Sequence, residues 1–135
     1  MNQHPDTALA RWAFADRLKS FGYAMAGLGW MLKTQHNAWL HLLATACVVS
    51  CGLFLQLRAQ DWCLLVVAMA LVWMAEAINT AMEYLCDVVS PQYSEAVKRA
   101  KDIAAGSVLI AACAAAIIGS LTFWPYINIW LRSVD

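Results

Sequence analysis

Three long apolar stretches, separated by short polar ones, dominate the pattern of this sequence. They cover residues 38–57, 62–88 and 103–124. Each is near the length of roughly 20 helical residues that a hydrocarbon core of about 30 Å requires. We predict three transmembrane helices, because a helix satisfies its own backbone hydrogen bonds in lipid. Pro125 is expected to end or kink the third helix.

The segment before these stretches has a different pattern. From Ala8 to Leu32, apolar residues recur at three- and four-residue steps, and the basic residues Arg17 and Lys19 flank them. This pattern is typical of an amphipathic helix on a membrane surface, predicted here over residues 8–32. A helix that packs on its own domain would show the same pattern, so both arrangements stay open.

The composition also indicates a membrane protein. Of 135 residues, 62% are hydrophobic and 13% charged, whereas soluble domains average about half apolar and a quarter charged residues. We therefore predict an all-α membrane protein with three spans and a surface helix in one domain, residues 1–135. The formal net charge is zero, so no nucleic-acid partner is expected. Five cysteines without a CxxC pair are interpreted as free thiols.

Basic residues predict the orientation of the chain. Most lysines and arginines lie before the first apolar stretch or between the second and the third. The positive-inside rule places both regions in the cytoplasm. We accordingly expect an integral protein of the bacterial cytoplasmic (inner) membrane.

The second apolar stretch ends in a polar stripe. Glu76, Asn79 and Glu83 are three and four residues apart, and Asp87 follows four residues later, so all four share one helix face. Acidic groups at membrane depth are costly and mark functional sites. Glu76 and Asn79 follow a long apolar run and are expected to lie deep, whereas Glu83 and Asp87 could simply be solvated at a helix end.

Lys101 and Asp102 enter the third stretch from the same predicted side of the membrane. Carboxylates bind Mg²⁺, a lysine neutralises phosphate, and a spare carboxylate can accept a proton from an attacking hydroxyl. Glu76 and Glu83 are two helical turns apart, about 10 Å, so we expect one to be a base and the other a metal ligand. A surface ion pair between Lys101 and Asp102 is the structural alternative.

These residues resemble a known family. The ExxNxxxE element at residues 76–83, with Asp87 and the Lys101–Asp102 pair, is similar to the small prokaryotic membrane lipid kinases, the diacylglycerol kinase and undecaprenol kinase family. The upstream stretch 17–24 also fits, and the likeness covers about residues 11–125.

The resemblance implies a homotrimer that transfers the γ-phosphate of ATP to a lipid hydroxyl with Mg²⁺, in sites shared between subunits. It makes Glu76 the general base and Asn79 a residue that supports the site, and it makes Glu83 a Mg²⁺ ligand. The further residues that it assigns to nucleotide, metal or lipid are Arg17, Tyr23, Gln35, Gln92, Tyr93, Ser94, Lys101 and Asp102.

Gln35 departs from the family pattern, in which the diacylglycerol kinases place a second metal-binding glutamate. An amide oxygen can bind Mg²⁺, but it brings no charge. The pattern RxKSFxYA at residues 17–24 looks more like the undecaprenol branch, so undecaprenol is the favoured lipid and diacylglycerol the other. A small proton- or ion-coupled transporter is the alternative function, because intramembrane carboxylates also mark ion pathways.

Overall fold

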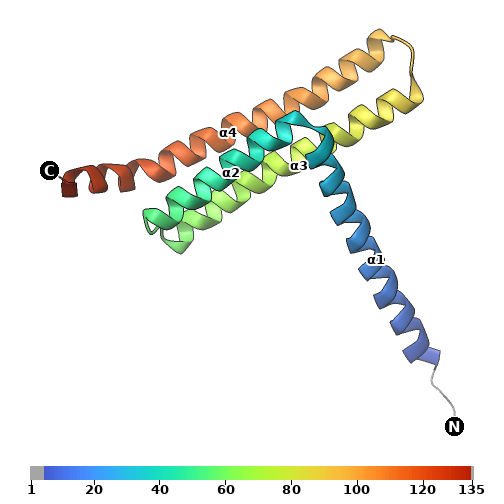
Figure 1. Ribbon diagram of the computed structural model, residues 1–135, viewed down its shortest axis with the longest axis horizontal. Helices are drawn as coiled ribbons and strands as arrows, with labels where there is room; N and C mark the ends of the chain where they lie inside the picture. Colours follow the sequence, from blue (N-terminus) through green and yellow to red (C-terminus); the bar gives the residue numbers. More distant parts are fainter. Residues whose placement is uncertain (1–4, 135) are drawn as a thin grey trace. The chain divides into compact units, whose positions relative to one another are not determined.

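The structure, a computed structural model, describes residues 5–134, and over this range it consists of α-helices without a strand (Figure 1). The helices are α1 (Pro5–Thr34), α2 (His36–Phe54), α3 (Ala59–Val89) and α4 (Glu95–Val134). The predicted all-α class is confirmed.

The chain divides into two compact units, residues 1–34 and residues 35–135. The first unit holds α1, which contains the predicted surface helix, residues 8–32. The amphipathic character of this helix, its place on the membrane and the single-domain organisation stay predictions. The other three helices form the second unit.

Three helices in the described part of the chain are long and apolar enough to cross a membrane, namely α2, α3 and α4. They correspond to the three predicted spans, and the protein is an integral membrane protein. Helix α2 ends three residues before the predicted boundary at Leu57, because Gln56 takes a positive φ of 52° that a helix does not allow. Helix α4 continues past Pro125 to Val134, so the helix does not end there; the other expected outcome, a kink at Pro125, stays a prediction.

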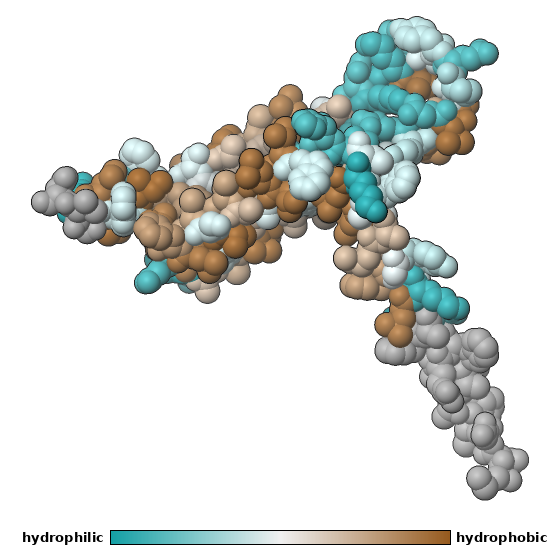
Figure 2. All heavy atoms as spheres, viewed as in Figure 1, coloured by the Kyte–Doolittle hydropathy of each residue, from teal (hydrophilic) through white to brown (hydrophobic). Residues whose placement is uncertain are grey.

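Helix α3 is the centre of the second unit and packs against both α2 and α4. In its most apolar stretch 33% of the residues are buried within the chain, against 11% for α2 and 6% for α4. Most apolar side chains of α2 and α4 therefore face outward, as they do in lipid or against further copies. Figure 2 shows hydrophilic residues gathered around the loop between α3 and α4, away from this apolar surface.

A polar cluster joins the turn between α2 and α3 to α4. Nε of Arg58 donates to Oδ2 of Asp61 at 3.1 Å and to the hydroxyl oxygen of Tyr126 at 3.2 Å, and this hydroxyl donates to Asp61. The hydrogen bond to Asp61, and then the one to Tyr126, raises the pKa of Arg58 above its ordinary value. The cluster fixes the end of the unit opposite the α3–α4 loop.

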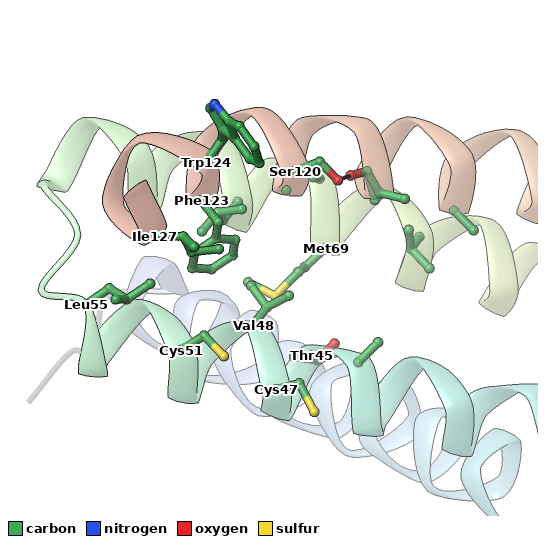
Figure 3. Close-up of a pocket in the computed structure, with 18 of the residues that line it drawn as sticks. Thr45, Cys47, Val48, Cys51, Leu55, Met69, Ser120, Phe123, Trp124 and Ile127 are labelled. Carbon is green, nitrogen blue, oxygen red and sulfur yellow. Dashed lines mark hydrogen bonds between the residues drawn. The ribbon is translucent and has the colours of Figure 1, made fainter. Parts of the chain in front are cut away.

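A pocket of about 800 Å³ opens among α2, α3 and α4. Figure 3 shows Val48 and Cys51 of α2, Met69 of α3, and Phe123 and Trp124 of α4 around it. Its lining is mainly apolar. The five cysteines, two of which line the pocket, are free thiols as predicted.

Gly52 allows α2 to approach α3 closely. A Cβ atom at Gly52 would lie 2.7 Å from Cη2 of Trp62. Overpacking of this kind costs about 1–3 kcal/mol, whereas a change of glycine to alanine in an open helix position stabilises by about 0.5–1 kcal/mol. We predict that Gly52→Ala lowers the thermal unfolding midpoint in detergent micelles.

Gly119→Ala is the matched control, because a Cβ atom there meets no atom within 4 Å. Its midpoint should stay unchanged or rise. Adding Trp62→Phe to Gly52→Ala should recover part of the loss, because the smaller ring leaves room for the new methyl group. An unchanged midpoint in Gly52→Ala alone would show that this contact does not limit the packing of α2 on α3.

Candidate active site

Glu76 lies on the buried face of α3, with a side chain that is only 1% exposed. Asn79 and Thr80, one turn further along, are buried as well. Neither carboxylate oxygen of Glu76 has a hydrogen-bond partner within the described chain. A buried carboxylate is costly without such partners. Glu76 is therefore a candidate functional residue.

The carboxylate of Glu83 accepts hydrogen bonds from two amides, one on α3 and one on the residue that precedes α2. Nδ2 of Asn79 donates to Oε1 of Glu83 at 3.1 Å, and Nε2 of Gln35 donates to Oε2 at 3.1 Å. Gln35 is the non-helical residue that precedes α2, which brings it beside α3. The structure therefore brings the three predicted residues Gln35, Asn79 and Glu83 together.

This cluster fits Mg²⁺ by the chemistry of its oxygens. Oδ1 of Asn79 is buried and accepts no hydrogen bond from any described group, although it belongs to the amide that holds Glu83. Mg²⁺ prefers such oxygen ligands and completes its shell with waters and substrate phosphates. Among the described side chains no group of three or more His, Cys, Asp or Glu could hold a metal ion. A cation here would therefore depend on the single carboxylate of Glu83, on amide oxygens and on phosphate.

Lys101 and Asp102 have separate partners. Nζ of Lys101 pairs with Oδ1 of Asp87 across α3 and α4. Oδ2 of Asp102 instead pairs with Nζ of Lys98 at 3.0 Å, one turn away on the same helix. Lys101 therefore meets the acidic stripe, while Asp102 lies in an exposed ion pair on α4. An ion pair between Lys101 and Asp102 themselves is not what the structure shows.

The predicted loop residues lie between α3 and α4. The hydroxyl of Tyr93 donates to Oε2 of Glu95 at 2.7 Å, and the carbonyl oxygen of Ser94 accepts from the backbone N–H of Lys98 at 2.9 Å. The carbonyl oxygen of Gln92 accepts from the hydroxyl of Ser90 at 3.2 Å. These contacts order the loop locally.

Arg17 and Tyr23 lie on α1, in the other unit of the chain. Their approach to the site stays a prediction.

The spacing of polar residues in the sequence does not predict a role for His41. Its Nε2 atom lies 3.6 Å from Oε2 of Glu76, and the two residues are on different helices. The signal that points to it in the sequence is its position within residues 38–57, a span that contains no formally charged residue. No spacing rule links it to Glu76, because the two residues are 35 positions apart and lie on different helices.

Fold and site together define a class of protein: a small helical membrane protein with a buried carboxylate next to an acid-and-amide cluster that fits a phosphate-bound cation. The profile of the family "prokaryotic diacylglycerol kinase" matches residues 22–123. The chain belongs to this family, as the resemblance of its ExxNxxxE element predicts.

Named relatives fall into both branches of the family. The diacylglycerol kinase of Synechocystis sp. is 39% identical over 109 residues, which are 80% of this chain and 62% of the relative. The undecaprenol kinase of Bacillus subtilis is 33% identical over 79% of this chain and 87% of its own length. The diacylglycerol kinase of Escherichia coli K12 is 30% identical over 84% of this chain and 93% of its own length.

Tyr93 provides a test of the loop geometry. The hydrogen bond to Glu95, then burial, then the charge of Asp102 raise the pKa of Tyr93 above its ordinary value of 10.0. The fold stabilises the neutral phenol, so this contribution is present below pH 10 and is lost as the pH rises through the raised pKa. We predict that Glu95→Gln moves the ionisation of Tyr93 to lower pH.

The measurement is a pH titration followed by tyrosinate absorbance, with Tyr93→Phe identifying the step that belongs to Tyr93. If Tyr93 ionises at the same pH with and without the Glu95 carboxylate, the contact is absent in solution.

Proposed function

We propose that the protein is an ATP-dependent lipid kinase that transfers the γ-phosphate of ATP to the hydroxyl of a membrane lipid. One observation carries this proposal. Glu76 is a buried carboxylate without a hydrogen-bond partner in the described chain, and seven residues along the same helix Glu83 is held by two amides. The two carboxylates thus have different environments, which supports one as the proton acceptor and the other as the charge-binding group in phosphoryl transfer to an alcohol. Membership in the kinase family supports the same reaction.

Phosphoryl transfer passes through a loose transition state, so catalysis consists mainly of positioning and charge neutralisation. Glu76 accepts the proton of the lipid hydroxyl while the hydroxyl oxygen attacks the γ-phosphorus of ATP, and ADP leaves. Glu83 and Gln35, with Asn79 beside them, would hold Mg²⁺, and the bound ion would neutralise phosphate charge. Lys101 supports the same neutralisation from α4.

The remaining predicted residues are proposed as nucleotide contacts. Asp102 binds the metal or the nucleotide. Arg17 and Tyr23 of α1 approach the nucleotide from the surface helix. The loop residues Gln92, Tyr93 and Ser94 contact the nucleotide, and the polar end of the unit around this loop supports their access to water (Figure 2).

We place this end at the cytoplasmic face of the bacterial inner membrane. The basic residues Lys98, Arg99 and Lys101 follow the α3–α4 loop, and the positive-inside rule favours the cytoplasm for such segments. ATP is available on that side. A homotrimer with sites shared between subunits is part of the proposal, and the outward-facing apolar surfaces of α2 and α4 support it.

Undecaprenol is the proposed lipid, with diacylglycerol as the other candidate. The RxKSFxYA pattern at residues 17–24 supports this choice, while the named relatives include kinases of both lipids. No observation favours the alternative of an ion-coupled transporter.

We predict that Glu76→Gln lowers the rate of lipid phosphorylation by about 10²–10⁴-fold, the usual contribution of a general base. The amide keeps the size of the side chain but cannot accept the proton. The measurement follows radiolabelled phosphate from ATP into undecaprenol and diacylglycerol in parallel mixed micelles. Undecaprenol should be the better acceptor.

Asp16→Asn is the matched control, since it also removes one negative charge, from an exposed carboxylate on α1. Its rate should equal that of the unmodified protein. Full activity of Glu76→Gln would remove Glu76 from the role of base, and phosphorylation of neither lipid would contradict the lipid kinase.

We predict opposite effects of two changes on the Mg²⁺ dependence of activity. Glu83→Gln removes the charge of the metal site and should raise the Mg²⁺ concentration for half-maximal rate about tenfold, equivalent to about 1.4 kcal/mol. Gln35→Glu places a second carboxylate beside Glu83 and should lower it by a similar factor.

Asn37→Asp controls for general electrostatic attraction, because it adds the same charge at an exposed position two residues away. It should leave the Mg²⁺ dependence unchanged. Equal effects of Asn37→Asp and Gln35→Glu would contradict a metal site at Gln35.

A further inference from the structure

Four side chains form an interlocked group where α2 packs on α3. His41 and Thr45 are four residues apart on α2, and Trp73 and Glu76 are three residues apart on α3. Nε1 of Trp73 donates to Oγ1 of Thr45 at 3.0 Å. The ring of His41 packs edge-on against that of Trp73, with centroids 6.4 Å apart and planes at 67°. The imidazole is therefore held between Trp73 and Glu76.

The contact between His41 and Glu76 joins atoms that have no hydrogen-bond partner in the described chain. Nε2 of His41 and both carboxylate oxygens of Glu76 are buried and have no hydrogen bond to any described group. Nε2 lies 3.6 Å from Oε2, slightly more than the roughly 2.7–3.2 Å of an N–H···O bond. Hydrogen bonds of catalytic groups are often long without substrate and shorten when it binds. A shift of less than one ångström would make this bond.

We propose that His41 is a positioning residue for Glu76. Its Nε2–H donates to Oε2 of Glu76 and leaves Oε1 as the oxygen that accepts the proton of the lipid hydroxyl. The imidazole neither gains nor loses a proton in this step. Trp73, fixed by Thr45, sets the orientation of the imidazole. The inference rests on the proposed function, in which Glu76 is the base.

His41→Leu tests the proposal. It removes the N–H donor and places an apolar side chain of similar size at the edge of the pocket. We expect kcat to fall by about 10- to 100-fold, as when a group that orients a functional residue is lost, with KM for ATP and for lipid unchanged. His41→Gln restores an N–H donor and should recover most of the rate. His36→Leu, the same change at an exposed histidine, should have no effect.

A second measurement reads the contact without activity. In protein labelled with ¹⁵N at histidine, Glu76→Gln should shift the Nε2 resonance of His41 and leave that of His36 unchanged, because only His41 loses a charged acceptor. This measurement does not need the His41→Leu variant, so it tests the contact even if that variant does not fold.

The outcomes separate the two proposals. Loss of activity in Glu76→Gln together with a normal kcat in His41→Leu would overturn the role of His41 and leave the kinase proposal intact. A His41 resonance that does not respond to Glu76→Gln would overturn the contact itself. Full activity of Glu76→Gln together with a shifted His41 resonance would contradict the base, and with it the positioning role, while the contact would stand.

Discussion

The burial of one carboxylate in an apolar helix is the constraint on which the rest of this structure depends. With the Arg58–Asp61–Tyr126 cluster at one membrane interface, about 20 helical residues span the hydrocarbon core. Counted from Trp62 along α3, they end near Ala81. On this count we propose that Glu76 lies inside the core, whereas Glu83 and Asp87 lie at or beyond its edge. The same polar stripe thus provides a desolvated group and a hydrated one.

This difference in depth explains how the two glutamates are held. Glu83, near water, receives one amide donor on each oxygen from Gln35 and Asn79, and such donors stabilise a charged carboxylate that can bind a cation. Glu76 receives none within the described chain, apart from the approach of His41. The oxygens of Glu76 are therefore left without a donor in the described chain, whereas both oxygens of Glu83 already accept a hydrogen bond from an amide.

The fold could be predicted from the sequence to the extent that hydropathy determines it. Apolar length located the three spans, and the steps between Glu76, Asn79 and Glu83 located the buried face of α3, because both depend on local periodicity. The end of α2 was misplaced, since the positive φ of Gln56 is a property of the turn and not of apolar composition. Of the two outcomes expected at Pro125, an end of the helix is excluded by the continuation of α4 to Val134, because a proline disrupts one turn of a 40-residue helix and leaves the other turns intact.

Contacts between helices were the part of the site that periodicity could not provide. Lys101 and Asp102 are neighbours in sequence, yet successive helical residues point about 100° apart, so Lys101 reaches Asp87 on α3 while Asp102 pairs along α4. His41 meets Glu76 only because α2 packs against α3, and Gly52, about three turns further along α2, lets α2 pack closely against Trp62 of α3. If His41 positions Glu76 as proposed, the orientation of the base depends on a glycine that carries no chemistry. On these proposals, a change that separates α2 from α3 at Gly52 would act on Glu76 through His41, without touching any residue proposed to meet ATP or lipid.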